Sequence, residues 1–128
     1  MPLFEKHFTV AEANAMLPEL RALLAEIRAA RDELAVHWEG ALPVLKAAGT
    51  NGGSKAATEC VADLLRLNKL LRSIASRGVL IKDIDRGLVD FPHLRGDEEV
   101  VLCWELCEER VAFWHDLETG YTGRQPIE

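Results

Sequence analysis

The chain has 128 residues, of which 48% are hydrophobic and 28% charged, and its formal net charge is −6. This length predicts a single domain, residues 1–128, that buries roughly two thirds of the surface of its unfolded chain. A phosphate backbone is bound by clustered Lys and Arg, so the acidic balance excludes nucleic acid as an expected partner. We find no apolar run long enough to span a membrane and no signal-peptide pattern, and therefore expect a cytoplasmic protein without a membrane partner.

Residues 9–39 have the pattern of one long helix. Thr9 and Glu12 are spaced as a capping box, in which each side chain accepts a hydrogen bond from the other residue's amide. Apolar residues then recur every three or four positions as far as Trp38. Pro18 interrupts the hydrogen bonding but not this spacing, so we expect it to kink the helix rather than end it.

Residues 40–55 contain Pro43 and a glycine-rich run, and they predict a flexible linker after the first helix. A second helix is predicted over residues 56–77, because its leucines repeat the same three-four spacing. Gly78 provides the expected helix cap at its C-terminal end. We expect the two helices to pair as an antiparallel hairpin.

The hydrophobic period changes from helical to alternating after Gly78, and residues 78–116 are predicted to form an antiparallel meander. Four strands are expected, near Val79–Lys82, Leu88–Phe91, Glu99–Leu106 and Val111–Asp116. Residues 117–128 form a C-terminal tail. The predicted fold class is therefore α+β, with a long antiparallel helical hairpin packed on one face of a small four-stranded antiparallel meander.

Alternation along the predicted strands sorts their side chains onto two faces. The first face, which must cover the helices, collects Val79, Ile81, Val89, Phe91, Val100, Leu102, Trp104, Leu106, Val111, Phe113 and His115. The second face collects Leu80, Lys82, Leu88, Asp90, Val101, Cys103, Glu105, Ala112, Trp114 and Asp116. Because the second face mixes apolar and charged residues, we interpret it as a subunit interface, a ligand site or a surface covered by the tail.

The second face supplies one candidate ligand site. Lys82 and Arg124 would provide charge, Trp114 a stacking surface, and Asp90 and Glu105 the balancing carboxylates. Such a set suits a small anionic or amphipathic ligand. The same residues also fit a salt-bridged interface, which we consider the better interpretation.

A metal site is the less favoured alternative for this region. His115, with Glu108 as a second ligand, could hold a divalent metal. Asp116 cannot join His115 on one ion, because adjacent strand residues point to opposite faces. We therefore interpret His115 first as a hydrogen-bonded core histidine and expect no cofactor.

The segments FTVAEANAMLPEL, GVLIKDIDRGLVDFP, LCWEL, FWHD and GYTGRQP resemble the bacterial family catalogued as domain of unknown function 2203. The likeness covers most of the chain outside the linker. It implies a helical hairpin plus a small sheet in a bacterial cytoplasmic protein, and it implies no activity. The sequence differs from similar members at Cys107 and Glu109, where Gly and Pro are usual.

The expected function is that of a non-catalytic interaction or structural domain. Three cysteines without C-x-x-C spacing predict free thiols, and neither they nor any serine fall in a nucleophile pattern, so an enzyme is disfavoured. We expect a homodimer, formed through the second face, because that face would otherwise expose a large apolar patch. The alternative is a small-ligand or divalent-metal-binding protein with its site in residues 78–126.

Overall fold

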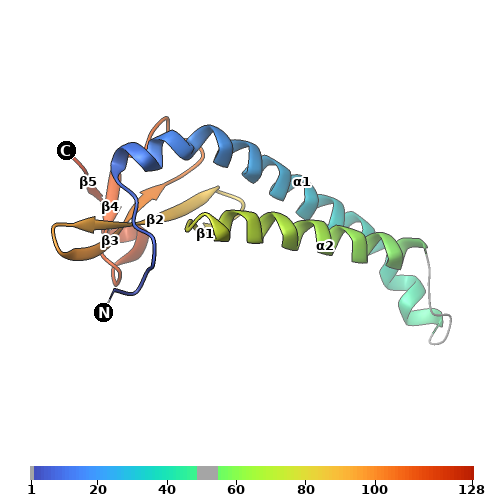
Figure 1. The fold of residues 1–128 in the computed structure, drawn as a ribbon. Coiled ribbons are helices and arrows are strands. Elements are labelled where there is room, and N and C mark those ends of the chain that lie inside the picture. Colours follow the sequence, from blue (N-terminus) through green and yellow to red (C-terminus); the bar gives the residue numbers. More distant parts are fainter. Residues whose placement is uncertain (1, 49–54) are drawn as a thin grey trace. The chain divides into compact units, whose positions relative to one another are not determined.

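The computed structural model describes residues 2–48 and 55–128 (Figure 1). The chain divides into two compact units. The sheet unit comprises Met1–Leu24 and Ser73–Glu128, and the hairpin unit comprises Ala25–Arg72. In the described residues, no helix is long and apolar enough to cross a membrane.

Helix α1 spans Val10–Ala48 and begins at the predicted capping box. The Glu12 amide donates to Thr9 Oγ1 at 3.0 Å, and the Thr9 amide donates to Glu12 Oε1 at 2.9 Å. The predicted end of this helix at Gly40 is wrong, because α1 continues through Pro43 to Ala48. The physical reason is that the apolar stripe continues into this segment, where Ala41 is fully buried.

Helix α2 spans Lys55–Ser76, close to the predicted bounds. Gly78 ends it with a φ of 86°, and the Gly78 amide donates to the Ala75 carbonyl at 2.9 Å. The part of the predicted linker that α1 and α2 do not occupy, residues 49–54, lies outside the described residues.

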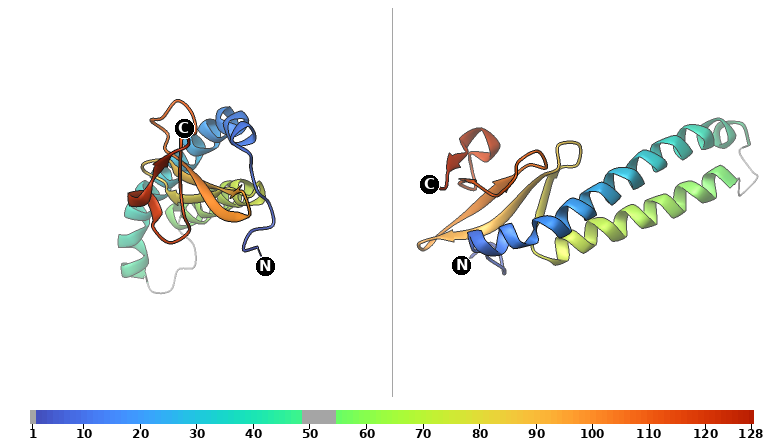
Figure 2. Two further views of the ribbon diagram at one scale, coloured as in Figure 1. Left: turned by 90° about the vertical axis from the view of Figure 1, so that its left-hand side faces the viewer. Right: turned by 90° about the horizontal axis from the view of Figure 1, so that it is seen from above.

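The hairpin unit pairs α1 with α2 as the sequence predicts, with the two helices running side by side (Figure 2). Ile27, Ala30 and Ala41 are fully buried in it. His37 of α1 forms an ion pair with Asp63 and, through Nε2, with Glu59 at 3.0 Å. Polar groups therefore also join the two helices.

The sheet has five antiparallel strands in the order β1-β2-β3-β4-β5, one more than predicted. They are β1 (Leu80–Asp83), β2 (Leu88–Arg95), β3 (Glu98–Trp104), β4 (Phe113–His115) and β5 (Gln125–Pro126). The α+β class and the meander order are confirmed. Strand β5 lies in the predicted tail and has two residues, too few to give an alternating pattern.

Strand β2 continues beyond its predicted end at Phe91 to Arg95, through Pro92. Proline cannot donate a hydrogen bond to a neighbouring strand. Strand β1 pairs only with the first part of β2, as far as Asp90. Beyond that point the chain before α1 lies along this edge of β2, and the Phe8 amide donates to the Pro92 carbonyl at 2.7 Å. On this edge of β2, Pro92 therefore needs only to accept a hydrogen bond through its carbonyl oxygen, and no N–H is required of it.

The register of β4 differs from the prediction by one residue. Val101 pairs with His115, and Leu102 pairs with Trp114. Since paired residues share a face, His115 lies on the second face and Trp114 on the first, the reverse of the predicted assignment. The prediction assumed a tight turn at residues 107–110 and a strand beginning at Val111. The connection between β3 and β4 is longer, spanning residues 105–112, which reverses the alternation.

The first face packs on the beginning of α1, within the sheet unit. The Arg21 guanidinium lies 5.1 Å from the ring centroid of Trp104 and donates to the Leu106 carbonyl at 3.0 Å. Asn14 Oδ1 accepts from the Val111 amide at 2.8 Å. These polar contacts fix α1 to the connection after β3, beside a core that includes Phe91.

Candidate metal centre

The second face of the sheet is covered by the chain itself. Val101 is 3% exposed and Cys103 is fully buried. Leu3 and Phe4 from the N-terminal segment and Tyr121 from the tail lie over this face, around a cavity of about 400 Å³. The patch that motivated a dimer through this face is therefore not exposed in the single chain.

Three potential metal ligands meet on this face, each from a different strand: Asp90 of β2, Cys103 of β3 and His115 of β4. Asp90 pairs directly with Cys103 in the ladder, and His115 pairs with Val101, two residues along the same face. Their ligand atoms all lie within 4.8 Å of one another, and all three residues are buried. Rigid strands thus hold the three groups in position.

The orientation of His115 follows from its backbone contact. Nδ1 lies 2.7 Å from the Asp116 carbonyl oxygen, which can only accept, so Nδ1 carries the proton. In the neutral ring, Nε2 then presents a lone pair, and it lies 3.4 Å from Asp90 Oδ1. In the neutral ring two acceptors would face each other at this distance, whereas a protonated ring would form an ion pair with Asp90.

Asp90 Oδ1 has no hydrogen-bond partner, although the Asp90 side chain is 4% exposed. An unpaired buried acceptor is costly, and native proteins rarely leave one unless a proton, an ion or water occupies the site. Burial raises the pKa of Asp90, and the neighbouring His115 and Lys82 oppose that shift. The carboxylate is therefore destabilised until a cation approaches.

The Cys103 thiol is the third group. Burial, together with the adjacent Asp90 carboxylate, raises its pKa to about 12. At neutral pH the free thiol is consequently protonated and unreactive, whereas coordination to a metal would deprotonate it. This environment disfavours a nucleophile, and a metal bound here would have to displace the thiol proton.

Thiolate, imidazole and carboxylate together form a donor set typical of Zn²⁺. Ligands about 2.0–2.1 Å from a tetrahedral ion lie about 3.3–3.4 Å apart, which matches the distance between His115 Nε2 and Asp90 Oδ1. The bond from His115 Nδ1 to the Asp116 carbonyl is the outer hydrogen bond that metal-bound histidines commonly make. Three protein ligands leave a fourth position open, as in zinc sites that bind a water or substrate.

The N-terminal segment is fixed beside this site by Glu99 of β3. Its carboxylate accepts from the amides of Leu3 at 2.6 Å and Phe4 at 3.0 Å, and from His7 Nε2 at 2.6 Å. The Leu3 amide contributes most to a lowered pKa of Glu99. Glu99 therefore holds two residues of the cavity wall in place.

The tail is fixed by an ion network that contains three of the sequence-predicted site residues. Arg124 donates to both oxygens of Glu108 at 2.8 Å, and its Nη1 lies 3.6 Å from Glu105. Glu105 also pairs with Arg86 at 2.6 Å and accepts from the Tyr121 hydroxyl at 2.8 Å. Arg124, Glu105 and Glu108 thus anchor the tail to the sheet.

Of the five residues predicted to bind a ligand, Lys82 and Asp90 line the cavity, and Glu105 and Arg124 lie in the tail network. Trp114 lies on the other face, under the Arg95 guanidinium at 4.1 Å. The predicted metal pair is not brought together as proposed, because His115 meets Asp90 and Cys103 whereas Glu108 pairs with Arg124.

Sequence reasoning missed Cys103 as a candidate ligand. The signal was present, since Asp90 and Cys103 were both assigned to the second face. Only the position of His115 was needed to complete the set, and it depended on the length of the β3–β4 connection.

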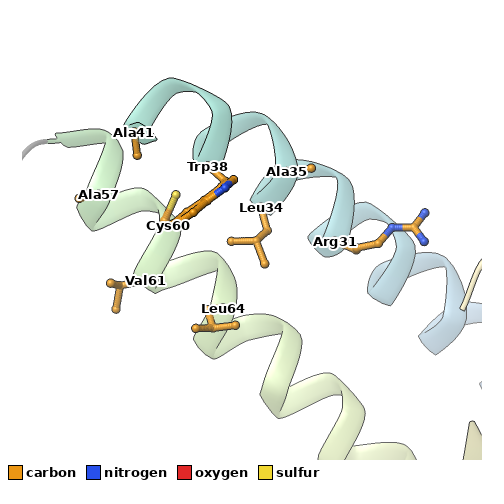
Figure 3. A pocket seen from close by; sticks show the side chains of 9 residues that line it. All are labelled: Arg31, Leu34, Ala35, Trp38, Ala41, Ala57, Cys60, Val61 and Leu64. Carbon is orange, nitrogen blue, oxygen red and sulfur yellow. The ribbon is translucent and has the colours of Figure 1, made fainter. Parts of the chain in front are cut away.

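A second cavity, of about 560 Å³, lies in the hairpin unit between α1 and α2 (Figure 3). Its lining is almost entirely apolar and consists of Arg31, Leu34, Ala35, Trp38, Ala41, Ala57, Cys60, Val61 and Leu64. Figure 3 shows the Trp38 ring beside Cys60. Trp38 is 50% exposed, and Val61 and Leu64 are also exposed.

One family model matches this chain, over residues 6–127, and its description is "Uncharacterized conserved protein (DUF2203)". No curated protein and no solved structure matches the chain. The match covers both helices and the whole sheet.

Proposed function

We propose that the chain, which belongs to the DUF2203 family, is a divalent-metal-binding protein whose sheet unit holds Zn²⁺ through Asp90, Cys103 and His115. The observation that carries the proposal is the unpartnered Asp90 Oδ1, which is buried and faces His115 Nε2 at 3.4 Å. The neighbouring Cys103 Sγ adds a soft ligand.

A proton could also join Asp90 to His115, as a buried ion pair. That arrangement would stabilise the carboxylate and would leave the Cys103 thiol, which lies within 4.8 Å of both ligand atoms, as a weak hydrogen-bond donor to Asp90. Metal coordination uses all three groups, and the cavity beside them gives the ion a path of entry.

The test is a Zn²⁺ titration of metal-stripped protein followed by calorimetry and native mass spectrometry. We expect one ion per chain. Cys103→Ser and Asp90→Asn each remove one ligand, and each should weaken binding by more than the roughly 10–100-fold that outer contacts contribute. Cys107→Ser removes an exposed thiol outside the site and is the matched control, with affinity unchanged.

Two results would contradict the proposal. One is protein that binds no stoichiometric Zn²⁺. The other is binding that Cys107→Ser weakens while Cys103→Ser and Asp90→Asn leave it intact. Because Asp90 and Cys103 are buried, circular dichroism of each variant must first show a folded chain.

Self-association is a second candidate function, and the apolar cavity of the hairpin unit supports it. Trp38, Val61 and Leu64 combine exposure with the lining of this cavity. Pairing with the same surface of a second copy would bury them, and two-fold pairing is the commonest form of homo-oligomer. This interface would replace the one expected on the second face of the sheet.

Sedimentation at micromolar concentration tests this candidate. We expect a dimer that Leu64→Glu dissociates, because the new carboxylate would be placed in an apolar contact. Lys69→Glu, an exposed change on the same helix outside the cavity lining, should leave the dimer intact. A monomeric wild type would rule the dimer out.

A further inference from the structure

The cavity beside Asp90, Cys103 and His115 extends well past these three residues. Its volume of about 400 Å³ lies in the range of sites for small molecules. Apolar side chains form much of the wall: Leu3, Phe4, Leu80, Leu88, Val101 and Leu117. The space therefore suits a ligand with an apolar body as well as a polar group that reaches the metal.

The charge of the cavity indicates the sign of that polar group. A divalent ion bound to the Asp90 carboxylate and the Cys103 thiolate has a formal net charge of zero. Lys82 then adds one positive charge to the wall, and its ammonium is close enough to act electrostatically on Asp90. In the described part of the chain, Lys82 makes no salt bridge, so it is free to pair with a ligand.

Glu118 is the remaining charged residue of the lining. Its side chain and that of Lys82 are both exposed, so water and salt screen both charges, but of the two it is Lys82 whose charge acts on Asp90. Lys82 belongs to β1, which pairs with β2, and it lies two residues along β1 from Leu80, the residue opposite Asp90. The positive charge and the open coordination position thus lie on adjacent strands.

We propose that this cavity binds a small carboxylate with an apolar body, one carboxylate oxygen taking the open position on the metal and Lys82 pairing with the negative charge. The inference rests on the proposed metal site. It assigns the ligand class of that site, and it requires no chemical change in the ligand.

The experiment uses the full chain loaded with Co²⁺ in place of Zn²⁺, since the visible spectrum of Co²⁺ reports on its ligands. Acetate, butyrate, hexanoate, the uncharged butyramide and inorganic phosphate are titrated separately. We expect a saturable spectral change with the carboxylates that is tighter for butyrate than for acetate, and none with butyramide.

Lys82→Met removes the charge but keeps the length of the exposed side chain. We expect it to weaken butyrate binding on the order of tenfold. Lys69→Met, an exposed lysine on α2, is the matched control and should leave binding unchanged. The Co²⁺ affinity should be similar in all three proteins.

The failures of the two proposals are distinguishable. Protein that takes up no Co²⁺ contradicts the metal site and this inference together. The carboxylate site alone is contradicted if the protein binds Co²⁺ but shows no change with any carboxylate, if it prefers phosphate or butyramide, or if Lys82→Met responds as wild type does.

Discussion

Trp104 and Trp114 both belong to the buried first face of the sheet, although they differ in their polar contacts. Trp104 is fully buried, and its Nε1 donates to the Glu108 carbonyl at 3.0 Å. Trp114 pairs with Leu102 and is covered in part by the Arg95 guanidinium. Both rings contribute to the core of the sheet unit.

Replacing either tryptophan should therefore destabilise the monomer. We expect Trp104→Ala to lower the free energy of unfolding by about 3–5 kcal/mol, and Trp114→Ala to give a loss near the lower end of that range. Trp38→Ala, at a half-exposed position in the hairpin unit, should cost less. Urea unfolding followed by circular dichroism measures all three, and a Trp114→Ala variant as stable as wild type would refute the observed register of β4.

Two turn glycines allow backbone strain and steric clash to be separated. Gly87 and Gly96 have similar positive φ values, 63° and 65°. A Cβ on Gly87 would lie 2.7 Å from the Leu106 Cβ, whereas a Cβ on Gly96 would meet nothing within 4 Å. We expect Gly96→Ala to lose about 1 kcal/mol and Gly87→Ala clearly more. Equal losses in urea unfolding would show that Leu106 moves aside at no cost.

Helix α1 continues past Gly40, and a substitution at this glycine tests that continuation. In a helix, glycine is less favourable than alanine by up to about 1 kcal/mol, and a Cβ at Gly40 would meet nothing within 4 Å. Gly40→Ala should therefore raise the melting temperature and the helical circular dichroism signal. A loss of either would indicate that the chain leaves the helix near Gly40, as the sequence alone predicts.

The hairpin should be more strongly held at acidic than at alkaline pH. The hydrogen bond to Asp63, assisted by the charges of Asp63, Glu59 and Glu33, raises the pKa of His37 above its usual value near 6.5. A group with a raised folded-state pKa gives stability that is fully present below its unfolded pKa and is lost as the pH rises through the folded value.

Melting wild type and His37→Gln between pH 5 and pH 9 measures this contribution. The difference between the two proteins should be largest at pH 5 and should shrink as the pH rises above 6.5. A difference that is constant across the range would mean that folding does not raise the pKa of His37.

At the scale of the whole molecule, the elements and their order were predictable because hydrophobic period and caps are local signals. The end of α1, strand β5 and the path of β2 through Pro92 were not, because each depends on a neighbour that the local sequence does not reveal. The N-terminal segment beside Pro92 is the clearest case.

The candidate metal site shows how a one-residue error in the predicted register of β4 changes which residues are brought together. Asp90 and Cys103 were correctly placed on one face, but a wrong length for the β3–β4 connection put His115 on the other. Since a shift of one residue reverses the face of every side chain in a strand, the set of three candidate ligands could not be recognised. The sequence also did not predict which residues cover the second face, because they come from segments at both ends of the chain.

Zinc-edge X-ray absorption of the Zn²⁺-loaded protein tests the central claim most directly, because it identifies the atoms bound to the ion. We predict one sulfur ligand at about 2.3 Å together with nitrogen and oxygen ligands at about 2.0–2.1 Å. The sulfur should disappear in Cys103→Ser and persist in Cys107→Ser. A zinc ion bound only by nitrogen and oxygen in the wild type, or a sulfur ligand that survives Cys103→Ser, would contradict a site built from Asp90, Cys103 and His115.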